Sequence, residues 1–144
     1  MFWRGVDSGH SYDYVDVFSN TSKYFPRMEL LSQSHLHPDV VDARLSGIYL
    51  PYTRAALTKL GMPEMQEISF VDVVDHIRYK YLISVDGWTA AWMRPNWIMA
   101  SNSVLIKQES SKVEWFTHAM KPYKHFYPVG NGLEGLVEGV QYLE

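Results

Sequence analysis

Polar residues follow three predicted strands of the sequence at the points where those strands end. Arg4-Gly5 ends the apolar N-terminal stretch, Asp86-Gly87 follows YKYLISV, and Gln108-Glu109 ends SVLIKQE. A glycine at such a point lets a backbone approach a phosphate closely, and the N–H groups of a following helix attract an anion. A carboxylate there can accept the hydroxyls of a ribose. These residue types favour binding of a phosphate-bearing ribonucleotide, although Asp-Gly is also common in plain turns and a solvated strand-end charge also explains Glu109.

Arg94 lies between Trp92 and Trp97 in a segment rich in aromatic and small residues. Its planar guanidinium is suited to bidentate pairing with a diphosphate. An arginine stacked on a neighbouring indole ring explains the same residues without any ligand. The sequence leaves both interpretations of Arg94 open.

Other residues capable of chemistry form weaker patterns. His35 and His37 lie two apart in a predicted loop, without the cysteine or carboxylate partners that complete a metal site. His118 and His125 belong to separate predicted elements. The sequence contains no Walker loop, no G-x-S-x-G and no G-x-G-x-x-G. We therefore expect no metal site and no bound cofactor.

The composition excludes several other classes of protein. The 144 residues suit one domain with one core, and the net charge of −3 leaves no basic face for nucleic acid. No apolar run approaches the roughly 18 residues of a membrane span, and the N-terminus has no secretory apolar segment. The chain has no cysteine, which excludes disulfides and cysteine-based zinc sites.

Strand and helix signals alternate along the chain. Pro26 fits the first turn of a helix, Gly61 fits the residue after one, and capping boxes at Ser69 and Ser111 predict two helix starts. Pro95 disturbs the start of another helix. The expected strands are residues 1–5, 40–45, 79–85, 103–108 and 124–129, and the expected helices are residues 26–35, 52–61, 73–77, 88–102, 112–120 and 133–143.

This alternation is typical of an α/β layered sheet with right-handed crossovers. Ligands of such sheets bind outside the carboxyl ends of the strands. We therefore expect a Rossmann-like sheet with helices on both faces, and one crevice into which the polar strand ends point.

Six segments together resemble the CAP10-type glycosyltransferases, the family of protein O-glucosyltransferases and of enzymes that modify capsules or lipopolysaccharides. They are FWRG, PRMELL, VDARLSG, YKYLISVDGWTAAW, SNSVLIKQES and KPYKHFYPV, and the last three carry most of the specificity. The resemblance implies the C-terminal, donor-binding domain of a two-domain GT-B enzyme, spanning residues 1–144. The N-terminal domain, with the acceptor site and the aspartate proposed as catalytic base, is expected to be absent from this chain.

The resemblance also implies which residues bind the donor. Arg94 would face the phosphates, Glu109 would face the nucleoside, and Arg4 and Gly5 would border the same crevice. Asp86 matches the donor loop rather than the catalytic base, so no catalytic residue is expected here. The loop beneath the diphosphate-sugar would consist of Gly87, Trp88, Thr89, Ala90 and Ala91.

Two departures from the family pattern affect these expectations. Asp7-Ser8 stands where some members have arginine or threonine, which places one donor contact in doubt. The segment between Ala91 and Ser103 is one residue longer than in similar sequences, which leaves the match of Arg94 uncertain by one position.

The function expected from the resemblance is transfer of glucose, xylose or a related sugar from a nucleotide-sugar, UDP first, to a protein or glycan hydroxyl with inversion. The isolated chain is expected to be incomplete and to need a separate N-terminal half. A non-catalytic binding module that retains the fold is the alternative, to which Asp7 lends support, and an orphan gene fragment is a third. The expected location is the cytoplasm if the chain is complete, and the secretory lumen is open if it is a fragment of a eukaryotic relative.

Overall fold

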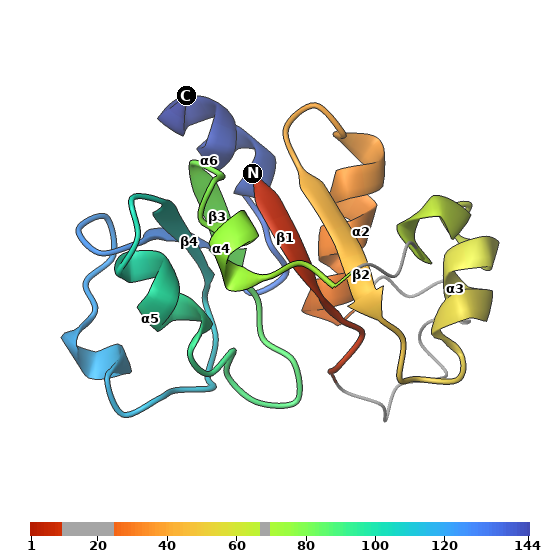
Figure 1. The fold of residues 1–144 in the computed structure, drawn as a ribbon, viewed down its shortest axis with the longest axis horizontal. Coiled ribbons are helices and arrows are strands. Elements are labelled where there is room, and N and C mark those ends of the chain that lie inside the picture. The colour runs from red at the N-terminus through yellow and green to blue at the C-terminus, as the bar shows by residue number, and fades with distance from the viewer. Residues whose placement is uncertain (10–24, 67–69) are drawn as a thin grey trace.

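A parallel five-stranded sheet forms the centre of the structure, a computed structural model that describes residues 1–9, 25–66 and 70–144 (Figure 1). Its strands lie in the order β2-β1-β3-β4-β5 and all neighbouring pairs are parallel. They are β1 (Phe2–Val6), β2 (Asp42–Gly47), β3 (Tyr81–Ser84), β4 (Val104–Gln108) and β5 (Tyr127–Val129). The order reverses between β1 and β3, because β2 lies outside β1 while β4 and β5 follow β3 on the other side. The predicted α/β, Rossmann-like class is confirmed.

Helices cover both faces of this sheet, as Figure 1 shows. Trp3 and Ile83 point into a core shared with buried residues of α2, α3 and α6, whereas Phe2 and Leu82 point into a smaller core with Ile98 of α5. This alternation is the two-residue period of a strand. None of the described helices is long and apolar enough to cross a membrane. The helical elements are α2 (Pro26–Leu36), α3 (Thr53–Lys59), η1 (Pro63–Gln66), α4 (Val73–His76), α5 (Arg94–Met99), η2 (Thr117–Ala119) and α6 (Leu136–Leu143).

Local sequence signals explain where several helices begin and end. Pro26 occupies the first turn of α2, as predicted. Gly61 follows α3 with a φ of +74°, a conformation that glycine adopts without steric cost. Asp72 caps α4, because its side chain accepts a hydrogen bond of 3.1 Å from the N–H of Val74. Ser69, the other member of the predicted capping box, lies outside the described residues.

Two helices begin later than the sequence predicts. The helix expected over residues 88–102 begins at Arg94, because Trp92 has a left-handed φ of +50° and Pro95 fits only the first turn. The last helix begins at Leu136, since Leu133 and Gly135 have φ values of +65° and +77°. The segment that precedes α5 is therefore a loop at the end of β3.

The helix predicted over residues 112–120 is wrong, and the single turn η2 replaces it. The hydroxyl of Ser110, rather than that of Ser111, accepts the N–H of Lys112 at 2.9 Å. The N–H of Glu114 donates to the hydroxyl of Thr117, also at 2.9 Å. These side chains satisfy backbone donors locally, and the chain after β4 forms a loop.

Candidate functional site

Arg27 joins the carboxyl ends of β1 and β3, where the order of the strands reverses. It lies in the first turn of α2, and its Nη1 donates to the carbonyl of Val6 at 2.7 Å. Its Nε donates to the carbonyl of Asp86 at 3.1 Å and its Nη2 to that of Val85 at 3.4 Å. In sheets of this order, ligands bind outside the strand ends at the reversal point. Arg27 therefore lies at the place where a ligand is expected.

Arg94 reaches the same region from the first residue of α5. Its Nη2 donates to the carbonyl of Arg4 at 2.9 Å. The centre of its guanidinium lies 5.8 Å from the ring centroid of Trp3 and 5.7 Å from that of Trp97. The guanidinium of Arg27 also lies 5.8 Å from the Trp3 ring. We call Arg27 and Arg94 the arginine pair.

The two side chains of the arginine pair are half-buried cations. Burial lowers the pKa of Arg27 to about 10, while the charges of Asp86 and Asp7 act to raise it. Burial also lowers the pKa of Arg94 to about 10, and repulsion from Arg27 adds to this effect. Both groups are still cationic at neutral pH. Within residues 1–9, 25–66 and 70–144 neither forms an ion pair, so an anionic ligand would stabilise both.

Gly87 follows β3 and lies against Arg27. A Cβ atom on Gly87 would overlap the hydroxyl of Ser8 and lie 2.8 Å from Nη2 of Arg27. Its N–H donates to the carbonyl of Thr89 at 3.1 Å, which closes a tight loop. A side chain at this position would displace Arg27, so the glycine is required by the approach of a cation to the backbone.

Asp86 is buried at the end of β3 and retains unused hydrogen-bonding capacity. Its N–H donates to Oε1 of Gln108 at 3.1 Å, and Nε2 of Gln108 donates to the carbonyl of Asn131 at 2.6 Å. Its Oδ2 has no hydrogen-bond partner among the described residues. A buried carboxylate oxygen without a donor is costly, so the hydroxyl of a bound sugar is a chemically suitable partner.

The loop after Gly87 exposes two aromatic rings near the arginine pair. Trp88 and Trp92 are exposed, at 54% and 70% of their full accessibility. Nε1 of Trp92 donates to the hydroxyl of Thr89 at 2.9 Å, which holds the ring in its exposed position. Ala90 and Ala91, in the same loop, are half-buried.

The remaining predicted residues lie nearby but are engaged differently. Arg4 forms an ion pair of 2.8 Å with Asp42, so only its carbonyl faces the arginine pair. A Cβ on Gly5 would overlap the ring of Trp3, so Gly5 makes room for that ring. Glu109 is exposed at the end of β4, and its N–H donates to the backbone of β5. The predicted donor contacts of all three remain predictions.

Asp7 has a structural role that the sequence did not reveal. It is buried, and its carboxylate accepts the N–H groups of Tyr49 and Leu50 at 2.7 and 3.0 Å and the hydroxyl of Thr53 at 2.6 Å. It thereby fixes the connection between β2 and α3. This departure from the family pattern is explained by the fold and no longer favours a non-catalytic module.

Sequence reasoning also missed Arg27, although a local signal was present. Cations are disfavoured in the first turn of a helix, where the macrodipole is positive. An arginine directly after Pro26 at a helix start is therefore unusual and indicates a tertiary partner or an anionic ligand.

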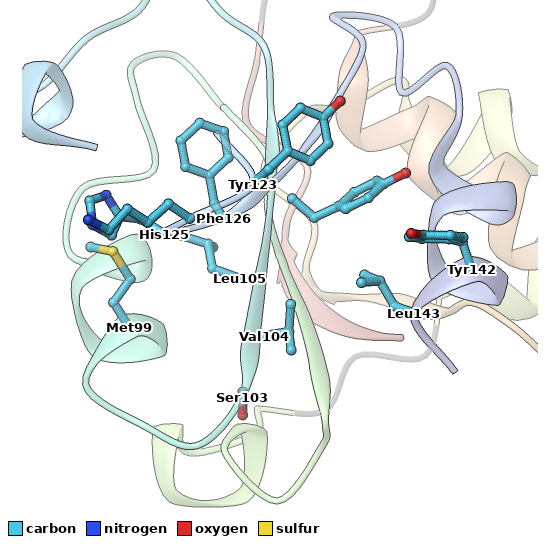
Figure 2. A pocket seen from close by; sticks show the side chains of 11 residues that line it. Met99, Ser103, Val104, Leu105, Tyr123, His125, Phe126, Tyr142 and Leu143 are labelled. Carbon is cyan, nitrogen blue, oxygen red and sulfur yellow. The ribbon is translucent and has the colours of Figure 1, made fainter. Parts of the chain in front are cut away.

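A separate hollow of about 830 Å³ lies at the opposite ends of β4 and β5. Figure 2 shows side chains that line it, among them Met99 of α5, Ser103 directly before β4 and Tyr142 of α6. None of the predicted donor-binding residues lines it. In the described parts of the chain, no three histidine or acidic side chains are grouped as metal ligands would be.

Comparison with known proteins reveals similarity along most of the chain. The model of glycosyl transferase family 90 matches residues 17–144. Protein O-glucosyltransferase 3 of Mus musculus is 31% identical over 116 residues, which cover 81% of this chain and 22% of that protein. Protein O-glucosyltransferase 2 of Danio rerio is 29% identical over 141 residues, or 98% of this chain and 24% of the relative. Protein O-glucosyltransferase 1 of Homo sapiens is 28% identical over 137 residues, which cover 87% of this chain and 32% of that protein. The chain thus spans between about a fifth and a third of these relatives.

Proposed function

Because the chain belongs to glycosyl transferase family 90, the CAP10-like family predicted from its sequence, we propose that the arginine pair binds the diphosphate of a nucleotide-sugar. The observation that carries the proposal is that the half-buried guanidinium groups of Arg27 and Arg94 both lie 5.8 Å from the ring of Trp3. Among the described residues they donate to backbone carbonyls and form no ion pair. Planar guanidinium groups match phosphate oxygens in charge and geometry. UDP is the nucleotide we expect.

The names of the relatives support a transferred group and an acceptor. Their name, protein O-glucosyltransferase, supports glucose or a related sugar such as xylose as the transferred group. The same name supports a hydroxyl of a protein, or of a glycan on it, as the acceptor. Two carboxylates are candidates for contacts with sugar hydroxyls: Oδ2 of Asp86, which is buried and has no hydrogen-bond partner among the described residues, and the exposed side chain of Glu109.

The reaction assigns separate tasks to the two halves of the enzyme. The acceptor oxygen bonds to the anomeric carbon while the bond from that carbon to the diphosphate breaks, and the electron pair passes to the phosphate oxygen. The acceptor proton passes to a base. Arg27 and Arg94 would stabilise the charge that develops on the leaving diphosphate. The base and the acceptor surface would belong to an N-terminal domain, so this chain would be the donor-binding half of an inverting GT-B enzyme.

Ligand-observed NMR with the purified chain tests the proposal. UDP, ADP and GDP are compared at millimolar concentration, and we expect saturation transfer to UDP above the other two. Affinity should be weak, because half of the proposed cleft belongs to another domain. Absence of transfer to every nucleotide, from a protein that is folded by circular dichroism, would refute nucleotide binding.

A further inference from the structure

Lys112 extends from the loop after β4 to the donor loop after β3. Its backbone N–H donates to the hydroxyl of Ser110 at 2.9 Å, which fixes the turn that carries it. Its Nζ donates to the carbonyl of Gly87 at 2.5 Å, and the side chain is half-buried. The ammonium of Lys112 therefore lies beside Gly87, the residue that packs against Arg27.

Gly87 brings Lys112 and the arginine pair into one small region. Nη2 of Arg27 lies 2.8 Å from the position of a Cβ on Gly87, and Nζ of Lys112 lies 2.5 Å from its carbonyl oxygen. Standard bond lengths within the glycine then place the two nitrogens within about 10 Å of each other. Two charge-assisted hydrogen bonds of about 2.8 Å, joined by a diphosphate, span such a separation.

The contact with the carbonyl of Gly87 leaves most of the capacity of the ammonium unused. A lysine ammonium has three N–H donors, and the carbonyl is a neutral acceptor that takes one of them. Among the residues described, no carboxylate pairs with Lys112. An anion is a stronger acceptor than a neutral carbonyl, so a phosphate placed here competes well for this ammonium.

We propose that Lys112 is a third cationic contact of the bound diphosphate, to which its ammonium moves from the carbonyl of Gly87. This inference rests on the proposed function, since it assigns a further residue to the same ligand. Lys112 approaches from β4, opposite Arg27 on α2. A ligand with two phosphates contacts both Arg27 and Lys112, whereas a monophosphate contacts one of them. Lys112 therefore discriminates a diphosphate from a monophosphate.

The test compares Lys112→Met and Lys112→Arg with the exposed control Lys124→Met, using calorimetric titration of UDP, UMP, uridine and inorganic pyrophosphate. We expect Lys112→Met to weaken UDP and pyrophosphate about 10-fold. UMP and uridine should change less than about twofold, Lys112→Arg should retain most of the affinity, and Lys124→Met should behave as wild type. An equal loss of affinity for all four ligands would show that Lys112 only stabilises the loop. Unchanged affinities for UDP and pyrophosphate would show that it contacts no phosphate.

Pyrophosphate separates this inference from the proposed function, because it carries no nucleoside. Pyrophosphate binding that depends on Lys112, in a protein without preference for any nucleotide, would support the lysine and refute the nucleotide-sugar. If UDP and uridine bind and their affinities are unchanged in Lys112→Met, the nucleotide site is supported and the contact of Lys112 with the diphosphate is refuted. A wild-type chain that binds neither UDP nor pyrophosphate would overturn both.

Discussion

The guanidinium groups of Arg27 and Arg94 lie at the same distance, 5.8 Å, from the ring of Trp3. The two arginines come from different helices, α2 and α5, which pack on opposite faces of the sheet. Both approach Trp3 because they donate to carbonyls of β1, Arg27 to that of Val6 and Arg94 to that of Arg4. An indole ring is the best aromatic partner for a cation and offsets part of the cost of burying two of them. The remaining positive charge is the basis of the proposed diphosphate site.

Replacement of Asp7 by alanine should destabilise the fold. It would leave two backbone N–H groups and the hydroxyl of Thr53 without their acceptor. Each buried unsatisfied donor costs about 1–3 kcal/mol, so the free energy of unfolding should fall by about 3 kcal/mol or more. Urea denaturation measures this, with the exposed Asp39→Ala as control. A loss for Asp7→Ala no larger than that of the control would disprove the structural role.

The fold should lose stability in mild acid because of His76. Burial lowers the pKa of His76 below its ordinary 6.5, and the nearby charges of Arg94 and Arg4 add to this, against a hydrogen bond to the carbonyl of Asp72. Its Nε2 is buried without a hydrogen-bond partner among the described residues, and its ring packs edge-on against that of Phe2. His76 therefore binds a proton more readily in the unfolded chain than in the folded one. The free energy of unfolding falls as the pH decreases from about 6.5.

Urea titrations at pH 7.5 and pH 5.5 check this expectation. The free energy of unfolding should be lower at pH 5.5 for the wild type, and the difference should shrink in His76→Gln. The exposed His118→Gln should retain the full difference. Equal pH dependence in all three proteins would show that His76 is not the titrating group.

Glu109→Ala should weaken uridine and UDP alike. A carboxylate that accepts ribose hydroxyls contacts a part that both ligands share, and loss of such a bond costs about 1.5–3 kcal/mol, or roughly 10- to 150-fold. The exposed Glu138→Ala on α6 serves as control. A variant that loses UDP but keeps uridine would place Glu109 near the phosphates instead.

The chain alone should not glycosylate an acceptor, even when it binds the donor. Positioning an acceptor beside a base contributes effective molarities of about 10⁵ M or more, and we propose that the base lies in an N-terminal domain. Slow hydrolysis of the donor is compatible with an open half-site. A turnover assay with peptide and glycan acceptors, with and without an N-terminal half supplied from a relative, distinguishes these cases. Robust acceptor glycosylation by the 144 residues alone would mean that their own carboxylates supply the base.

The sequence predicted the sheet well, because its strands carry their own signals. The buried run Tyr81–Ser84 and the alternation of Phe2 and Trp3 between two cores follow from apolar patterning. The strand ends were also predictable, since Asp86-Gly87 interrupts an apolar run. The helix predicted from Ser111 failed because Ser110 and Thr117 took up the backbone donors that a capping box would need.

The arginine pair was only half predictable. Arg94 stood out by its aromatic neighbours, whereas Arg27 lies far in sequence from the strand ends that it joins. Its role depends on the carbonyls of Val6 and Asp86, which meet only in the folded sheet. Asp7 was misjudged for the same reason, because its partners lie on the connection after β2.

Titration of UDP and uridine into Arg27→Met and Arg94→Met tests the central claim most directly. Each variant removes one guanidinium, and Arg78→Met removes an exposed one as control. If the arginine pair binds the diphosphate, each variant loses about 10- to 150-fold in affinity for UDP. Affinity for uridine stays within about twofold, and the control binds both as wild type does. Equal losses for UDP and uridine in both variants, or unchanged UDP affinity in proteins that remain folded, would contradict a diphosphate site at Arg27 and Arg94.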